Sequence, residues 1–71
     1  MIVTKGTYVT WEDDNEKRSG MVQETYPEDV TLTLNDREMS RHGTPKDRAL
    51  FILDEAGNKY LKLESEVAKK K

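Results

Sequence analysis

The residues best suited to chemistry form a basic stretch in the second half of the chain. Four cationic side chains and the single histidine lie close together there, at Arg37, Arg41, His42, Lys46 and Arg48. Guanidinium groups make paired hydrogen bonds to phosphates and carboxylates, and an imidazole can contact an anion or carry a proton. Acidic residues alternate with these cations, which is typical of an ordinary salt-bridged surface. The stretch is the best candidate for a binding surface, and a salt-bridged surface is its simpler interpretation.

Four aromatic side chains are candidates for a cage around a methylated cation: Tyr8, Trp11, Tyr26 and Tyr60. Such a cage needs several ring faces around one point, because cation–π attraction acts within about 6 Å of a ring. Tyr8 and Trp11 fall in one predicted strand at positions of opposite parity, so they point to opposite faces of the sheet. Packing in the core is therefore the simpler interpretation of these rings.

Other reactive groups are too sparse for a catalytic or metal site. The chain has no cysteine and one histidine, which excludes a thiolate zinc site and a histidine cluster. No nucleophile motif accompanies His42, so a catalytic triad is not expected. The acidic residues Glu12, Asp13, Asp14 and Glu16 lack the glycine and final glutamate of a calcium loop, and we interpret them as a solvated loop. We expect no cofactor and no enzymatic activity; catalysis by paired carboxylates is the remaining enzymatic alternative.

Composition predicts one small domain with a slender core. The 71 residues are 34% hydrophobic and 37% charged, with a net charge of -2, which argues against a strongly basic nucleic-acid binder. Residues 69–71 form a lysine tail, and residues 4–68 are expected to form the domain. The longest apolar run, residues 49–53, is too short to span a membrane, and the first residues do not resemble a signal peptide. We expect a monomeric cytoplasmic protein with no membrane contact.

Period-2 alternation of apolar and polar residues predicts an antiparallel β-domain, with strands at residues 5–12, 20–26, 30–34, 48–54 and 59–63. Asn35-Asp36 tolerates positive φ and predicts a two-residue hairpin turn, which places Leu32 opposite Met39. Residues 12–20 are expected to be a mobile hairpin loop, residues 40–47 a loop, and residues 64–71 a helical turn that docks through Val67.

A small sheet of this kind shelters its edges best by closing on itself, which favours a five-stranded SH3-like barrel. The predicted core takes one face of each strand: Val9, Trp11, Val22, Val30, Leu32, Met39, Leu50, Ile52, Leu61 and Leu63. Phe51 and Leu53 belong to the opposite face of a strand that is apolar on both sides, and we expect them to lie beneath the terminal helical turn.

Several short motifs occur in a familiar order: residues 5–11 (KGTYVTW), 20–22 (GMV), 27–31 (PEDVT) and 43–47 (GTPKD), followed by LKLESEV at 61–67. Together they resemble the hypervirulence-associated Tudor domain family over residues 5–69. This chain departs from the family where Arg48 and Ala49-Leu50-Phe51 replace the usual proline and aromatic. The resemblance implies a Tudor-like, SH3-like barrel and no catalytic residues.

The sequence thus predicts an all-β, non-enzymatic interaction module that binds a protein or peptide through its aromatic and arginine-bearing surface. The alternative is a nucleic-acid-binding barrel that uses Arg37, Arg41, Lys46, Arg48 and the terminal lysines, and steep weakening of binding by salt would favour it.

Overall fold

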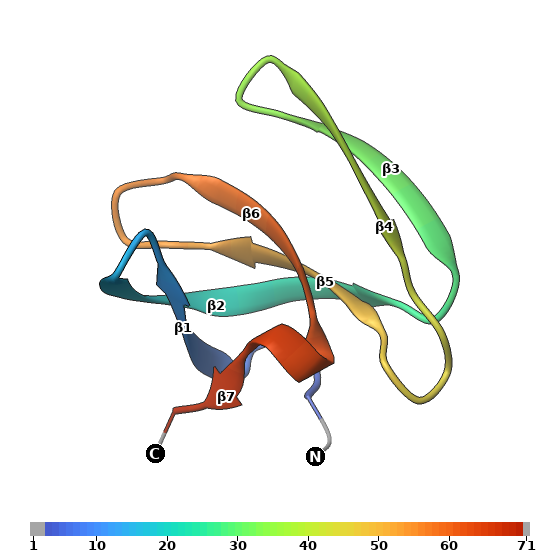
Figure 1. Cartoon of the computed structure of the whole chain (residues 1–71), viewed down its shortest axis with the longest axis horizontal. Helices are drawn as coiled ribbons and strands as arrows, with labels where there is room; N and C mark the ends of the chain where they lie inside the picture. The colour runs from blue at the N-terminus through green and yellow to red at the C-terminus, as the bar shows by residue number, and fades with distance from the viewer. Residues whose placement is uncertain (1–2, 71) are drawn as a thin grey trace.

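The computed structural model describes residues 3–70, which form seven antiparallel strands and one 3₁₀ turn (Figure 1). A five-stranded sheet has the order β6-β5-β2-β1-β7, and β3 and β4 form a separate two-stranded sheet. The all-β prediction is confirmed, although the described residues contain seven strands instead of five. The bounds are β1 Tyr8–Asp13, β2 Glu16–Tyr26, β3 Asp29–Leu34, β4 Arg37–His42, β5 Ala49–Leu53, β6 Lys59–Leu63, the 3₁₀ turn η1 Glu64–Glu66 and β7 Ala68–Lys69.

The acidic segment at residues 12–20, predicted as a mobile hairpin loop, does connect β1 and β2 as a hairpin, but most of it is paired strand. Asp14 and Asn15 form a two-residue turn, both with positive φ (51° and 66°), and the flanking residues pair from Asp13 opposite Glu16 onward. Short polar side chains tolerate this left-handed conformation, which matches the twist of the strands. The hairpin prediction is confirmed, but the predicted loop was too long, because a run of charged residues can form exposed strands when opposite charges pair across them.

The β3–β4 hairpin confirms its predicted turn and register. Asn35 and Asp36 have φ values of 52° and 63°, and Leu32 lies opposite Met39. Strand β4 continues to His42, so the predicted loop at residues 40–47 begins later than expected. What remains of that loop contains a small turn in which Thr44 and Asp47 pair.

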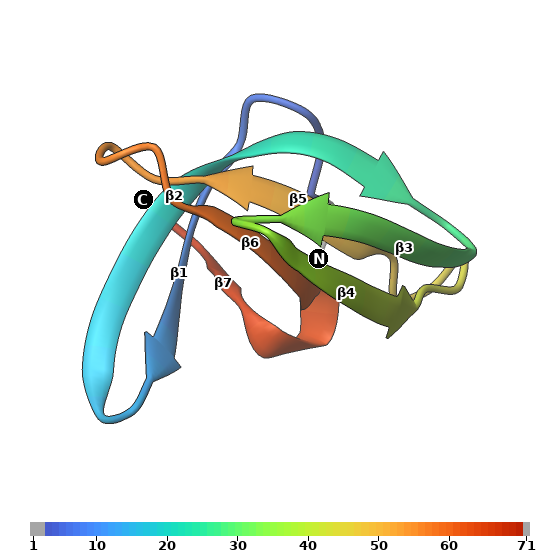
Figure 2. The same cartoon turned by 90° about the horizontal axis from the view of Figure 1, so that it is seen from above.

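The long strand β2 pairs with two other strands along its length. Its first half pairs with β1, and its second half, from Met21 to Tyr26, pairs with β5. A register shift between Val22 and Glu24 interrupts the pairing with β5, as expected of a bulge that bends a strand. Figure 2 shows β2 curving across the molecule before the chain enters β3.

The hydrogen-bonded sheet does not close into a barrel within residues 3–70. The β3–β4 hairpin lies beside β6, yet no backbone ladder joins the two sheets. Two side chains connect them instead: Asn35 Nδ2 donates to the carbonyl of Lys59 (3.3 Å) and Arg41 Nε to the carbonyl of Leu61 (3.3 Å). The predicted closed barrel is thus replaced by a curled sheet and a separate hairpin.

Strand β5 divides the apolar interior into two clusters, which explains why it is apolar on both faces. Leu50 and Ile52 belong to the first cluster, whereas Ala49 and Phe51 belong to the second. The first cluster also contains Val3, Val9, Trp11 and Val22, with Tyr60 and Val67 packed against it. The second also contains Leu34 and Leu61, with Tyr26, Val30, Leu32 and Leu63 packed against it.

Two packing predictions need correction: that Met39 belongs to the core, and that Phe51 lies beneath a terminal helical turn. Met39 is 38% exposed. It lies opposite Leu32, but this part of β4 reaches past the rest of the molecule, which leaves the Met39 side chain partly uncovered. Phe51 packs in the same cluster as Val30 and Leu32 of β3, so the hairpin rather than a terminal helix covers it.

The chain end is only briefly helical. The 3₁₀ turn η1 spans three residues, after which β7 pairs with β1 through Lys69 opposite Val9 and Ala68 opposite Thr10. Val67 packs against the first cluster as predicted. The expected helical segment is therefore a three-residue 3₁₀ turn followed by a two-residue strand. Lys69, assigned to the tail, belongs to the sheet, and Lys71 lies outside the described residues.

Candidate functional site

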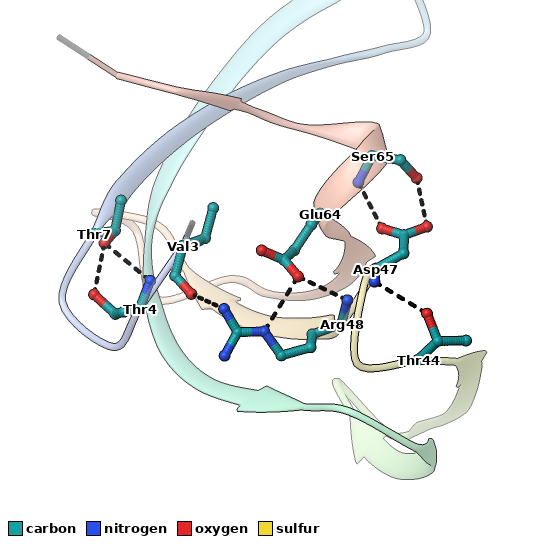
Figure 3. Close-up of polar contacts among 8 residues, drawn as sticks. All are labelled: Val3, Thr4, Thr7, Thr44, Asp47, Arg48, Glu64 and Ser65. Carbon is teal, nitrogen blue, oxygen red and sulfur yellow. Dashed lines mark hydrogen bonds and ion pairs between the residues drawn. The ribbon is translucent and has the colours of Figure 1, made fainter. Parts of the chain in front are cut away.

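Arg48, a predicted binding residue, is held by internal partners (Figure 3). Its backbone N–H and its Nε both donate to Glu64 Oε1, at 2.8 and 3.2 Å, and its Nη2 donates to the carbonyl of Val3 at 2.9 Å. Glu64 is only 6% exposed, so this carboxylate is largely removed from water. Arg48 therefore ties the N-terminal segment and η1 to the start of β5.

Arg41, another predicted binding residue, also forms its ion pair with η1. Its Nη2 lies 2.7 and 2.8 Å from the two carboxylate oxygens of Glu66, whose Oε1 also accepts the backbone N–H of Leu63. A further contact secures the same turn: Asp47 accepts the backbone N–H and hydroxyl of Ser65, both at 2.8 Å (Figure 3). Two arginines of the basic stretch thus hold the 3₁₀ turn in place.

The other members of the basic stretch are exposed but dispersed. His42 ends β4, and its Nδ1 contacts Asp29 Oδ1 at the start of β3. Arg37 begins β4 at the other end of the hairpin, and Lys46 lies in the turn between Thr44 and Asp47. The stretch is contiguous in sequence, but it does not form one cationic surface in space.

Trp11 and Tyr60 come together inside the first cluster. Their ring centroids are 5.0 Å apart with an interplanar angle of 63°, an edge-to-face contact. Trp11 is 4% exposed, which agrees with the interpretation that it packs in the core. Its ring faces are therefore taken up by neighbouring side chains.

The hydroxyl of Tyr60 donates to Asp54 Oδ2 (3.0 Å), and this contact affects both groups. Burial, followed by the hydrogen bond and the charge of Asp54, raises the pKa of Tyr60 above its ordinary value. Burial alone would raise the pKa of Asp54, but hydrogen bonds from Asn58 and Tyr60 lower it below its ordinary value. The pair anchors the β5–β6 turn.

The two remaining aromatic candidates lie in different places. Tyr26 packs against the second cluster, whereas Tyr8 is 55% exposed on the outer side of β1. Tyr8 and Trp11 occupy opposite faces, as the strand periodicity predicts. The four rings are therefore not brought around one point, and among them Tyr8 alone offers most of its surface to a partner.

Tyr8 lies at the centre of a surface that the register of β1 and β2 defines. Tyr8 is opposite Met21, and Thr10 is opposite Ser19; residues directly opposite share a face, and this face points away from the first cluster. Met21 in turn lies opposite Leu53 of β5, which extends an apolar row across three strands. We call this surface the Tyr8 face; its residues are Tyr8, Thr10, Lys17, Ser19, Met21 and Leu53.

Cations gather at one side of the Tyr8 face because β7 pairs with β1. Lys70 donates its backbone N–H to the carbonyl of Tyr8 (2.8 Å), and Lys69 pairs with Val9. An open hollow of about 460 Å³ lies between β7 and β2, and it is lined by Thr10, Lys17, Arg18, Ser19, Lys69 and Lys70. The face thus combines an exposed aromatic ring, an apolar row, two hydroxyls and a group of lysines.

Most residues of this surface were missed by sequence reasoning. Lys17 was assigned to a mobile loop and Lys69 to a tail, whereas both belong to paired strands. The signal for the first was present in Asp14-Asn15, two residues that favour the positive φ of a tight hairpin turn. No sequence signal indicated the two-residue strand β7, because its pairing depends on the tertiary arrangement.

The acidic residues predicted as a solvated loop form an ordinary ion-paired turn. Arg18 contacts Asp13 across the hairpin (3.8 Å) and Glu16 on its own strand (3.2 Å). Within residues 3–70, no three histidine, cysteine, aspartate or glutamate side chains converge to hold a metal ion. The same residues contain no helix long and apolar enough to cross a membrane.

Comparison with known proteins leaves the chain without an assigned relative: it matches no family model, no curated protein and no solved structure.

Proposed function

We propose that this protein is a non-enzymatic interaction module that binds an acidic peptide segment through the Tyr8 face. The observation that carries the proposal is the 55% exposure of Tyr8 at the first position of a paired strand, with Met21 and Leu53 continuing the apolar row. A large aromatic side chain in a sheet favours burial against a partner, and tyrosine is enriched at the energetic centres of interfaces.

The surroundings of Tyr8 indicate the chemistry of the partner. Lys17 and Lys70 lie at the rim of the face and Lys69 lines the adjoining hollow, and such charges steer an oppositely charged partner and select against a like-charged one. Thr10 and Ser19 supply hydroxyls beside the apolar row. The expected ligand therefore carries an apolar side chain that covers Tyr8 and acidic groups that reach the lysines.

The resemblance to the hypervirulence-associated Tudor domain family supports a role in binding rather than catalysis. The proposed fold relationship is an open variant of a Tudor-like, SH3-like arrangement, in which the β3–β4 hairpin stands beside β6 in place of a closed ladder. The proposed setting is cytoplasmic.

A random peptide library displayed on phage tests the proposal directly. We expect selected peptides to combine acidic and apolar residues, and Tyr8→Ala to weaken their binding by roughly tenfold or more, as for a central interface residue. Met39→Ala is the matched control, because Met39 is the other exposed large apolar side chain among residues 3–70 and lies outside the Tyr8 face. Binding of the selected peptides should perturb the amide resonances of Thr10, Ser19 and Lys69.

Two results would contradict the proposal. Selected peptides that bind Tyr8→Ala as tightly as the wild type would move the site elsewhere. The nucleic-acid alternative predicts a different outcome, namely binding of single-stranded oligonucleotides that weakens steeply with salt and is lost in Lys69→Gln/Lys70→Gln while Tyr8→Ala retains it.

A further inference from the structure

The β3–β4 hairpin has an open edge that the rest of the molecule does not cover. Strand β3 pairs with β4 alone, and its other side faces away from the five-stranded sheet (Figure 1). Two other edges are short or capped: β7 has two residues, and side chains of Asn35 and Arg41 bind carbonyls of β6. All six residues of β3 therefore lie on an edge that has no partner strand among residues 3–70.

The turn geometry determines which backbone groups this edge presents. A two-residue turn at Asn35-Asp36 makes Leu34 and Arg37 a hydrogen-bonded pair, and hydrogen-bonded pairs alternate along an antiparallel ladder. The backbone groups of Leu34, Leu32 and Val30 therefore point to β4. Those of Asp29, Thr31 and Thr33 point outward, where they have no partner strand in residues 3–70.

The exposed sequence is complementary to itself. When two copies of β3 pair antiparallel about a two-fold axis at Thr31, each Thr31 lies opposite its symmetry mate and Asp29 lies opposite Thr33 of the second copy. Threonine pairs are favourable across strands, and this register opposes no like charges. A two-residue shift of the register toward the start of β3 would place Thr33 opposite Pro27, which has no backbone N–H to donate. A two-residue shift the other way would place Asp29 opposite Asn35, which belongs to the turn and not to the strand.

The inward face agrees with this register. Val30 of one copy lies opposite Leu32 of the other, and both side chains are only partly buried against the second cluster. Pairing therefore continues the apolar side of the hairpin without a break. The edge also lacks the usual protection, since residues 29–34 contain no lysine, proline or bulge.

We propose that the chain self-associates through β3, so that two hairpins form a continuous four-stranded sheet of order β4-β3-β3-β4. A two-stranded hairpin is marginal by itself, and two further strands provide the width that an independent sheet needs. The partner is a second copy of this chain, and the contact is separate from the Tyr8 face.

Single-cysteine crosslinking tests the register, because the chain contains no cysteine of its own. Opposed Thr31 residues would have Cα atoms about 5.5 Å apart, within the range of about 4.4–6.8 Å that a disulfide spans. The two copies of Thr33 would lie about 14 Å apart along the strands. In a glutathione buffer, Thr31→Cys should form disulfide-linked dimers at least about tenfold faster than Thr33→Cys or Ser40→Cys.

A charge pair of variants tests the association without a crosslink. Thr31→Lys and Ser40→Lys both break the hydrogen bond between Thr31 Oγ1 and Ser40 Oγ (2.8 Å), and both add one lysine to the same exposed face. Only Thr31→Lys opposes two lysines across the two-fold axis. Sedimentation equilibrium should show a concentration-dependent dimer for the wild type and Ser40→Lys and a monomer for Thr31→Lys.

Three outcomes would overturn the inference: equal crosslinking rates at positions 31, 33 and 40; a wild-type chain that stays monomeric up to its solubility limit; or a dimer that Ser40→Lys weakens as much as Thr31→Lys. Tyr8→Ala should leave the dimer intact, so the outcome is independent of peptide binding at the Tyr8 face.

Discussion

Removing the Glu64 carboxylate should cost this small protein a large part of its stability. In Glu64→Ala, the backbone N–H and guanidinium of Arg48 lose the acceptor that lies 2.8 and 3.2 Å away. Breaking a buried ion pair on one side costs about 3–5 kcal/mol, and the 26% exposure of the Arg48 side chain lets water compensate in part. We expect a loss of about 3 kcal/mol, from a total of about 4–10 kcal/mol at ~0.05–0.15 kcal/mol per residue.

Urea unfolding followed by far-ultraviolet circular dichroism measures this loss. Glu64→Gln keeps the shape of the side chain and one acceptor oxygen, so it should cost about 1–2 kcal/mol. Glu66→Ala is the matched control, because Glu66 lies in the same turn and pairs with Arg41 while its side chain is 37% exposed. Its loss should be about 1 kcal/mol or less, as for pairs that water screens.

A double-mutant cycle separates the ion pair from general disruption of the turn. Arg48→Met combined with Glu64→Ala removes both charges, so the double variant should be destabilised by clearly less than the sum of the two single changes. A loss below about 1 kcal/mol in Glu64→Ala, with additive effects in the cycle, would refute the reasoning that a desolvated carboxylate holds these segments together.

Three further predictions test the packing and the titrating groups. Met39→Gln should change stability by no more than about 0.5 kcal/mol, whereas Leu34→Ala, at 5% exposure, should cost about 2–5 kcal/mol; equal losses would mean that Met39 is core. Gly43→Ala should cost about 1–3 kcal/mol in urea unfolding, because the added Cβ would lie 2.5 Å from the carbonyl oxygen of Tyr26; an unchanged midpoint would argue against that close approach. The phenol of Tyr60 has a raised pKa, so it stabilises the fold below the ordinary tyrosine pKa and this contribution is lost as pH rises through the folded value; the ultraviolet titration of wild type minus Tyr60→Phe should show a phenol ionising above its usual pH, and an ordinary midpoint would contradict it.

Local pattern accounts for much of the fold. Alternation along β3, together with two residues that accept positive φ, was enough to predict the turn at Asn35-Asp36 and the pairing of Leu32 with Met39. The same reasoning identified β5 as apolar on both faces. These features depend on neighbours within a few residues, where the side-chain period of a strand is fixed by backbone geometry.

Periodicity does not say how far a covering element extends, and this is why the core prediction failed at Met39. Met39 shares a side of the hairpin with Leu32, but Leu32 packs in the second cluster and Met39 remains 38% exposed. Periodicity does not predict closure of the sheet either, because closure depends on whether β4 and β6 approach closely enough to form backbone hydrogen bonds.

The candidate surface was the least predictable part. The sequence by itself determined the strand content, the parity that separates Tyr8 from Trp11, and the absence of thiol or histidine clusters. Only the tertiary structure determined that Arg41 and Arg48 bind the carboxylates of η1, and that β7 pairs with β1 and so places the terminal lysines next to the Tyr8 face. These contacts join residues 16 to 60 positions apart, and a long charged side chain takes whichever partner the folded chain brings within hydrogen-bonding distance.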